Sequence, residues 1–137
     1  MRLFLFILSV SLGASAFGQA KPEQAAQKPT EAWLGLLDAG KYAESWDEAS
    51  DMLKSQITKE QWEETAKKAR DQTGKLRSRE LKSAEYTETL PNAPAGKYVV
   101  FQYTATFDSG TFMETVAAAE DKGGSWKVAG YFVKPQS

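Results

Sequence analysis

The hydrophobic pattern of this chain changes its period once, close to residue 75. Before that point apolar residues recur every three to four positions, which is the spacing of one face of an α-helix. After it they alternate with polar residues, which is the spacing of a strand with one buried face. Because the helices come first and the strands follow as a group, the pattern predicts an α+β fold with helices packed on one face of an antiparallel sheet.

Three helices are expected in the first half of the chain. The first spans residues 30–40 and opens on Thr30, whose hydroxyl can cap the helix N-terminus. The second begins at Tyr42 and includes Leu53, with apolar residues on one side and carboxylates on the other. The third spans residues 58–74 and opens on a capping box.

Four strands are expected after the helices, joined by turns that contain Gly, Pro, Asn or Asp. They cover residues 79–90, 97–107, 111–120 and 125–134. Such short connections favour an antiparallel meander, curved around the helices. We therefore predict one domain over residues 30–134, preceded by a linker at 21–29 and followed by a tail at 135–137.

The first residues have the pattern of a signal peptide. Arg2 precedes an apolar run from Leu3 to Val10, and small residues then offer cleavage after Ala16 or after Ala20. The run is too short to span a bilayer, which needs about 20 helical residues. We predict a signal peptide over residues 1–20, an exported protein that is periplasmic or secreted, and no membrane span.

The composition excludes several classes of function. The chain has no His and no Cys, so it lacks the groups for a Ser-His-Asp triad, a thiolate nucleophile or a zinc site. It has 17 basic and 18 acidic residues, which does not favour nucleic-acid binding. No cofactor and no metal site is predicted. The acidic set has helical spacing that can chelate a hard cation, but we favour a solvated helix face, which needs no ligand: Glu44, Asp47, Glu48 and Asp51.

Several aromatic segments suggest a family. They are residues 31–34, 45–46, 61–62, 98–100, 114–116 and 126–132. In these segments the chain resembles exported bacterial proteins with a domain of unknown function, DUF 4019, over residues 30–134. The order of elements is also similar to the nuclear-transport-factor-2-like and cystatin-like folds, in which a curved sheet wraps around helices. That likeness implies a conical pocket, reduced or filled here because an extra pair of strands is missing.

Glu114 is a charged residue at a position that the pattern predicts to be buried, since strand alternation places it on a largely apolar face. A charge there needs a partner, and Arg79, Lys82 or Arg70 can provide an ion pair. We favour this structural interpretation. The alternative is an acid/base enzyme of the isomerase or dehydratase type, with Glu114 as the base and the phenol of Tyr103 as its second catalytic group.

The predicted function is that of a non-enzymatic exported module that binds a protein partner or a small apolar ligand. The candidate ligand-binding residues are Trp33, Trp46, Phe101, Tyr103, Glu114 and Trp126. Core packing alone also explains the tryptophans, because large aromatic side chains fill the space between helices and a sheet.

A homodimer is predicted through the outer face of the sheet, because that face has few charges and many small or apolar residues. The expected members of this face are Tyr98, Val100, Thr104, Thr106, Met113, Thr115, Ala117, Ala119, Ala129, Tyr131 and Val133.

Overall fold

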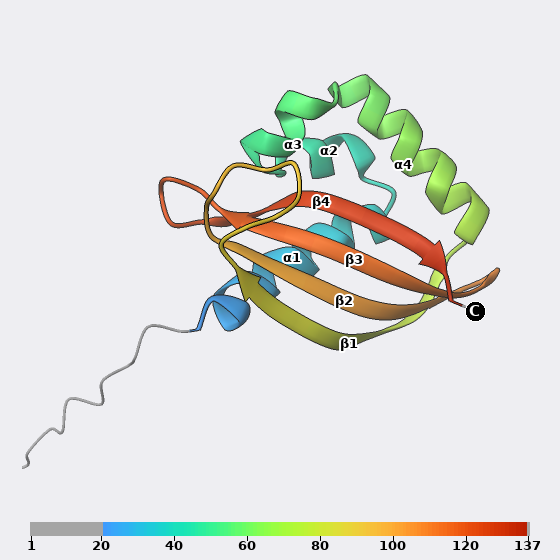
Figure 1. Cartoon of the computed structure of the whole chain (residues 1–137). Coiled ribbons are helices and arrows are strands. Elements are labelled where there is room, and N and C mark those ends of the chain that lie inside the picture. The colour runs from blue at the N-terminus through green and yellow to red at the C-terminus, as the bar shows by residue number, and fades with distance from the viewer. Residues whose placement is uncertain (1–20, 137) are drawn as a thin grey trace, which may run out of the picture.

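The computed structural model describes residues 21–136, so the predicted signal peptide lies outside the described residues. The helices are α1 (Pro22–Asp38), α2 (Tyr42–Asp47), α3 (Asp51–Gln56) and α4 (Lys59–Thr73). The strands are β1 (Leu76–Thr87), β2 (Tyr98–Phe107), β3 (Gly110–Glu120) and β4 (Trp126–Pro135). They form one antiparallel sheet in the order β1-β2-β3-β4, which confirms the α+β meander (Figure 1). Within residues 21–136, none of the helices is long and apolar enough to span a membrane.

Helix α1 begins eight residues earlier than expected, at Pro22 instead of Thr30. The expected linker at 21–29 is therefore wrong, because most of that segment is helical. Pro22 occupies the first turn, where a missing N–H does no harm. Pro29 lies inside the helix, but Ala26 and Thr30 are both buried on its inner side. Packing of this side against the sheet outweighs the local cost of the proline.

The second expected helix is split into α2 and α3. Ser50 lies between them and caps α3, since its hydroxyl accepts a hydrogen bond from the backbone N–H of Leu53. The backbone N–H of Ser50 donates to the carbonyl of Val128 on β4 at 2.8 Å. This long-range bond fixes the break, which is why periodicity alone did not predict it. The capping box of α4, formed by Thr58 and Gln61, is confirmed.

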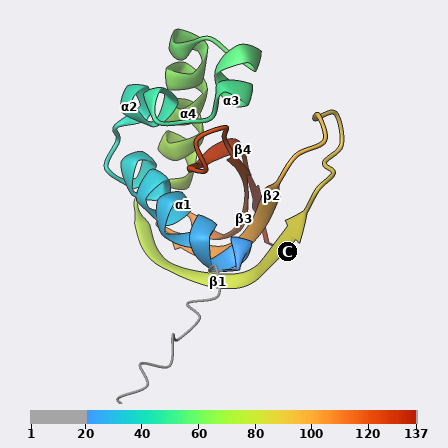
Figure 2. The same cartoon turned by 90° about the vertical axis from the view of Figure 1, so that its left-hand side faces the viewer.

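The sheet curves around α1, which lies along its concave side, while α2, α3 and α4 lie beside β4 (Figure 1, Figure 2). Trp33, Leu34 and Leu37 of α1 are buried in the same core as Phe101 and Tyr103 of β2. The predicted inward face of β2 is confirmed, because its alternate residues from Val99 to Phe107 are all buried. The sheet is open, so it matches the expected cone only approximately.

A β-bulge in β4 changes which side chains reach the core. Val128 and Gly130 pair with neighbouring residues of β3, so Ala129 is an extra residue between them. Beyond the bulge Tyr131 and Val133 face inward, and Phe132 faces outward with 69% of its surface exposed. The assignment of Tyr131 and Val133 to the outer face was wrong, because one extra residue exchanges the two faces.

Tyr98 is also less accessible than the outer-face prediction required. It is buried, and its hydroxyl donates to the carbonyl of Pro94 at 2.6 Å in the loop between β1 and β2. A Cβ atom at Gly96 would lie 3.4 Å from the Tyr98 ring. This loop therefore covers one end of the outer face.

Candidate functional site

A cluster of charged side chains lies between α1, α4 and the sheet. Glu114 on β3 has none of its surface exposed. Arg79 on β1 donates from Nε to Oε1 of Glu114 at 2.7 Å and from Nη2 to Oε2 at 3.2 Å. Nη2 of Arg70 on α4 lies 3.5 Å from Oε2, and the Tyr131 hydroxyl donates to the same oxygen. Both carboxylate oxygens of Glu114 are therefore occupied.

Asp38, the last residue of α1, completes this cluster. It accepts from Nη1 of Arg79 at 2.8 Å and from Nη1 of Arg70 at 2.8 Å. The group of Asp38, Arg70, Arg79, Glu114 and Tyr131 is called the buried ion cluster below. Its two arginines balance its two carboxylates. It joins α1, α4, β1, β3 and β4, so it fixes the positions of five elements.

The surroundings shift the pKa values of Asp38 and Tyr131. Burial by itself would raise the pKa of Asp38, but hydrogen bonds and charges from Arg79 and then Arg70 outweigh it and hold the pKa below its usual value. Burial, followed by the charge of Glu114, raises the pKa of the Tyr131 phenol. Asp38 is therefore an anion at neutral pH, and Tyr131 is a neutral donor.

The expected ion pair of Glu114 is formed by Arg79 and Arg70. Lys82 takes no part, because its ammonium lies 3.2 Å from Glu80. Tyr103 is buried and donates its hydroxyl to Glu31 at 3.2 Å, so it does not join Glu114 in a site. Burial, followed by the charge of Glu31, raises the pKa of the Tyr103 phenol.

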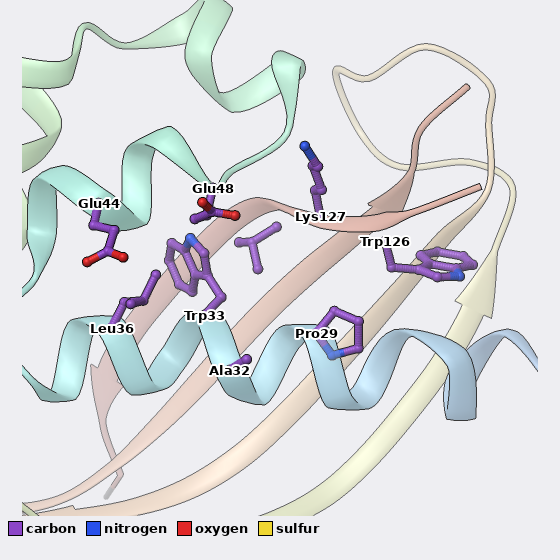
Figure 3. A pocket seen from close by; sticks show the side chains of 9 residues that line it. Pro29, Ala32, Trp33, Leu36, Glu44, Glu48, Trp126 and Lys127 are labelled. Atoms are coloured by element: carbon purple, nitrogen blue, oxygen red, sulfur yellow. The ribbon is translucent and has the colours of Figure 1, made fainter. Parts of the chain in front are cut away.

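A cavity with aromatic side chains in its wall lies between α1, α2 and β4 (Figure 3). We call it the tryptophan groove. Its volume is about 350 Å³, and Trp33 and Trp126 both contribute to its wall. Its lining residues are Pro29, Ala32, Trp33, Leu36, Glu44, Glu48, Trp126, Lys127 and Val128.

The wall of the tryptophan groove is held by buried hydrogen bonds. The indole N–H of Trp33 donates to the carbonyl of Ser45 at 2.8 Å, and that of Trp62 donates to the Ser45 hydroxyl at 2.9 Å. The rings of Trp33 and Trp62 lie 5.9 Å apart at a tilt, a favourable aromatic geometry. These contacts therefore hold the Trp33 side of the groove in place.

The rim of the tryptophan groove is charged. Glu44 lies on α2 and Glu48 caps its C-terminus four residues later, so the two side chains lie on the same side of the helix. Both are exposed, and Lys127 on β4 also lines the groove. Figure 3 shows Glu44 on α2, Glu48 at the end of this helix and Lys127 extending from β4.

The other candidate residues lie elsewhere. Trp46 donates its indole N–H to the carbonyl of Ile57 at 3.0 Å, and Lys54 lies over its ring at 5.6 Å. Phe101, Tyr103 and Glu114 are buried in the interior and do not line the tryptophan groove. Of the six candidate ligand-binding residues, the structure thus brings together Trp33 and Trp126.

Sequence reasoning missed the role of Glu44 and Glu48 at this rim. Their spacing placed them on one helix face, but only the tertiary structure, in which α2 packs against α1 and the groove separates it from β4, shows which surface they border. The acidic set is also divided, because Asp47 pairs with Lys59 at 3.0 Å. Within residues 21–136 no three potential metal ligands come together.

The basic residues between 67 and 82 do not form one surface. Lys67 pairs with Asp71 at 2.7 Å, and Arg77 pairs with Asp108 at 2.5 Å. Arg70 and Arg79 belong to the buried ion cluster. A second cavity of about 250 Å³ lies between α4 and β4, and Trp62, Ala66 and Val133 are among its lining residues.

Comparisons with known proteins give a family and a fold. A family model described as "Protein of unknown function (DUF4019)" matches residues 29–131. A structure from Catenulispora acidiphila, determined at 2.5 Å, is similar with a TM-score of 0.53 and 13% sequence identity. The similarity covers 81% of this chain and 88% of that chain. At this identity the likeness concerns the fold alone. No curated protein matches the chain.

Proposed function

This chain belongs to the DUF4019 family of proteins of unknown function, and from its geometry we propose that it is an exported, non-enzymatic binding module. Its site is the tryptophan groove, which receives an apolar group of a small ligand or of a protein partner. The observation that supports this most directly is a groove of about 350 Å³ with two tryptophans in its wall. Binding sites commonly combine an apolar wall with a few polar groups at fixed positions. The exported location rests on the signal-peptide pattern of residues 1–20.

The acid/base alternative has less support. A general base must come within hydrogen-bond reach of the proton that it removes. Glu114 has no exposed surface, and two arginines and Tyr131 already occupy its oxygens. Tyr103 is directed to Glu31 instead. We therefore favour a role for Glu114 in stability.

The neutral apolar probe N-phenyl-1-naphthylamine tests the proposed site. In NMR titrations we expect it to shift the indole signals of Trp33 and Trp126 and to leave that of Trp46 unchanged. Ala32→Phe should block these shifts, because Ala32 is exposed on α1 and lines the groove. Ala25→Phe is the matched control, since Ala25 is exposed on the same helix and does not line the groove. Equal shifts in both variants would contradict the proposed site.

We also propose a weak homodimer through the central strands of the outer face. Val100, Thr115 and Ala117 lie on this face, and the Phe132 ring lies beside Gly130 at its β4 side. A large exposed aromatic next to small residues is typical of a contact surface. The contact is weak because the sheet curves away on both sides of β2 and β3 (Figure 2).

Sedimentation at high micromolar protein concentration should show this dimer. Ala117→Lys should make the protein monomeric, because it places a charge in the centre of the contact. Phe132→Ser should weaken the dimer while the fold persists, since Phe132 is 69% exposed. A wild-type protein that stays monomeric over the whole concentration range would refute the dimer.

A further inference from the structure

We infer that the tryptophan groove binds a protein segment that presents an apolar side chain together with a Lys or Arg side chain. This inference rests on the proposed function and names the chemistry of the partner. It is carried by the apolar wall, the unpaired carboxylates on one rim and the size of the groove.

The apolar part of the groove has the dimensions of a side-chain pocket. Ala32 and Leu36 lie on one side, and Trp33, Trp126 and Val128 complete the wall. A volume of about 350 Å³ is near the lower end for ligand pockets, which run from roughly 300 to 1,000 Å³. It suits one or two apolar side chains and is small for a lipid chain.

The charge of the rim favours a cation. Glu44 and Glu48 are two carboxylates four residues apart, and in the described part of the chain neither makes an ion pair. Like charges at this spacing slightly destabilise a helix. Lys127 is the one basic residue among those that line the groove, so the lining has an excess negative charge. A Lys or Arg side chain of a partner would compensate both effects.

The position of the carboxylates favours a protein segment over a small cation or a membrane. Both are exposed, Glu44 on α2 and Glu48 at its C-cap, rather than buried at the bottom of the groove (Figure 3). A basic side chain next to an apolar one can reach such a rim while its neighbour enters the groove. An anionic membrane surface would instead be repelled by Glu44 and Glu48.

Synthetic peptides in a Gly-Ser background test this inference on the whole protein. The first peptide has one Phe between two Lys, the second has Glu in place of both Lys, and the third has Ser in place of Phe. We expect the first to shift the Trp33 and Trp126 indole signals, the second to bind at least about fivefold more weakly at low salt, and the third not to bind.

A variant that removes only the two negative charges of the rim tests whether the rim binds the basic side chain. Glu44→Gln with Glu48→Gln should weaken the first peptide about fivefold and remove most of the salt dependence. The matched control is Glu60→Gln with Glu64→Gln, which has the same spacing and charge change on exposed positions of α4. This control should leave the affinity unchanged.

The outcomes separate the two proposals. If the neutral probe binds but the two charged peptides bind equally well, the inference of a basic partner is wrong and the proposed function stands. The same conclusion follows if the neutral probe binds and the rim variant does not weaken binding of the first peptide. If neither the probe nor a peptide shifts Trp33 or Trp126, both are wrong. Binding to anionic vesicles without binding to the first peptide would also overturn the inference.

Discussion

Glu114→Gln is expected to lower the free energy of unfolding by about 3–5 kcal/mol. The amide keeps the size of the carboxylate but removes its charge, so two arginines remain with one carboxylate in a buried setting. The side chain of Arg79 is 13% exposed and that of Arg70 is 7% exposed, so water solvates the unbalanced positive charge very little. The substitution also replaces one acceptor oxygen by an N–H donor. That donor faces the N–H and O–H donors of the cluster, so hydrogen bonds are left unmade.

Urea unfolding followed by tryptophan fluorescence measures this loss. Glu120→Gln is the matched control, because Glu120 lies on the same strand and makes no ion pair within residues 21–136. It should change stability by less than about 0.5 kcal/mol. Glu114→Met combined with Arg79→Met should cost less than the sum of the two single changes, since the pair is removed together. A loss below about 1 kcal/mol for Glu114→Gln would mean that the cluster does not hold the fold together.

Asp38→Asn is expected to lower the free energy of unfolding at pH 7 by about 2–3 kcal/mol. The loss is smaller than for Glu114, because 22% of the Asp38 side chain is exposed. The arginines hold the pKa of Asp38 below its usual value, so the contribution of Asp38 is present above the unfolded value of about 3.9. It is lost as the pH falls through the lower, folded value.

The difference in stability between wild type and Asp38→Asn should therefore shrink as the pH falls below about 4. Unfolding curves over a pH series measure it. Asp47→Asn serves as the control, because Asp47 forms an exposed pair with Lys59 that contributes less than about 1 kcal/mol. A difference that stays constant down to low pH would show that Asp38 acts without its charge.

Local patterns in the sequence determined the class of fold and part of the buried ion cluster. The change of period near residue 75 was sufficient for an α+β meander, because side-chain spacing directly fixes which face of a helix or strand is buried. The same alternation placed Glu114 on the inner face and required a basic partner. Which basic residue serves could not be read from the sequence, since Arg70, Arg79 and Lys82 are all distant in sequence from Glu114.

The remaining features depend on contacts between distant segments, which local spacing does not record. The hydrogen bond from Ser50 to Val128 divides a continuous helical pattern into two helices. Packing of Ala26 extends α1 into a segment whose sequence is typical of a linker. The bulge at Ala129 brings Tyr131 to Glu114 and turns Phe132 outward. The tryptophan groove exists because α1, α2 and β4 place Trp33 and Trp126, 93 positions apart, in one wall. Sequence supplied the residue types, and only tertiary packing decided which of them share a surface.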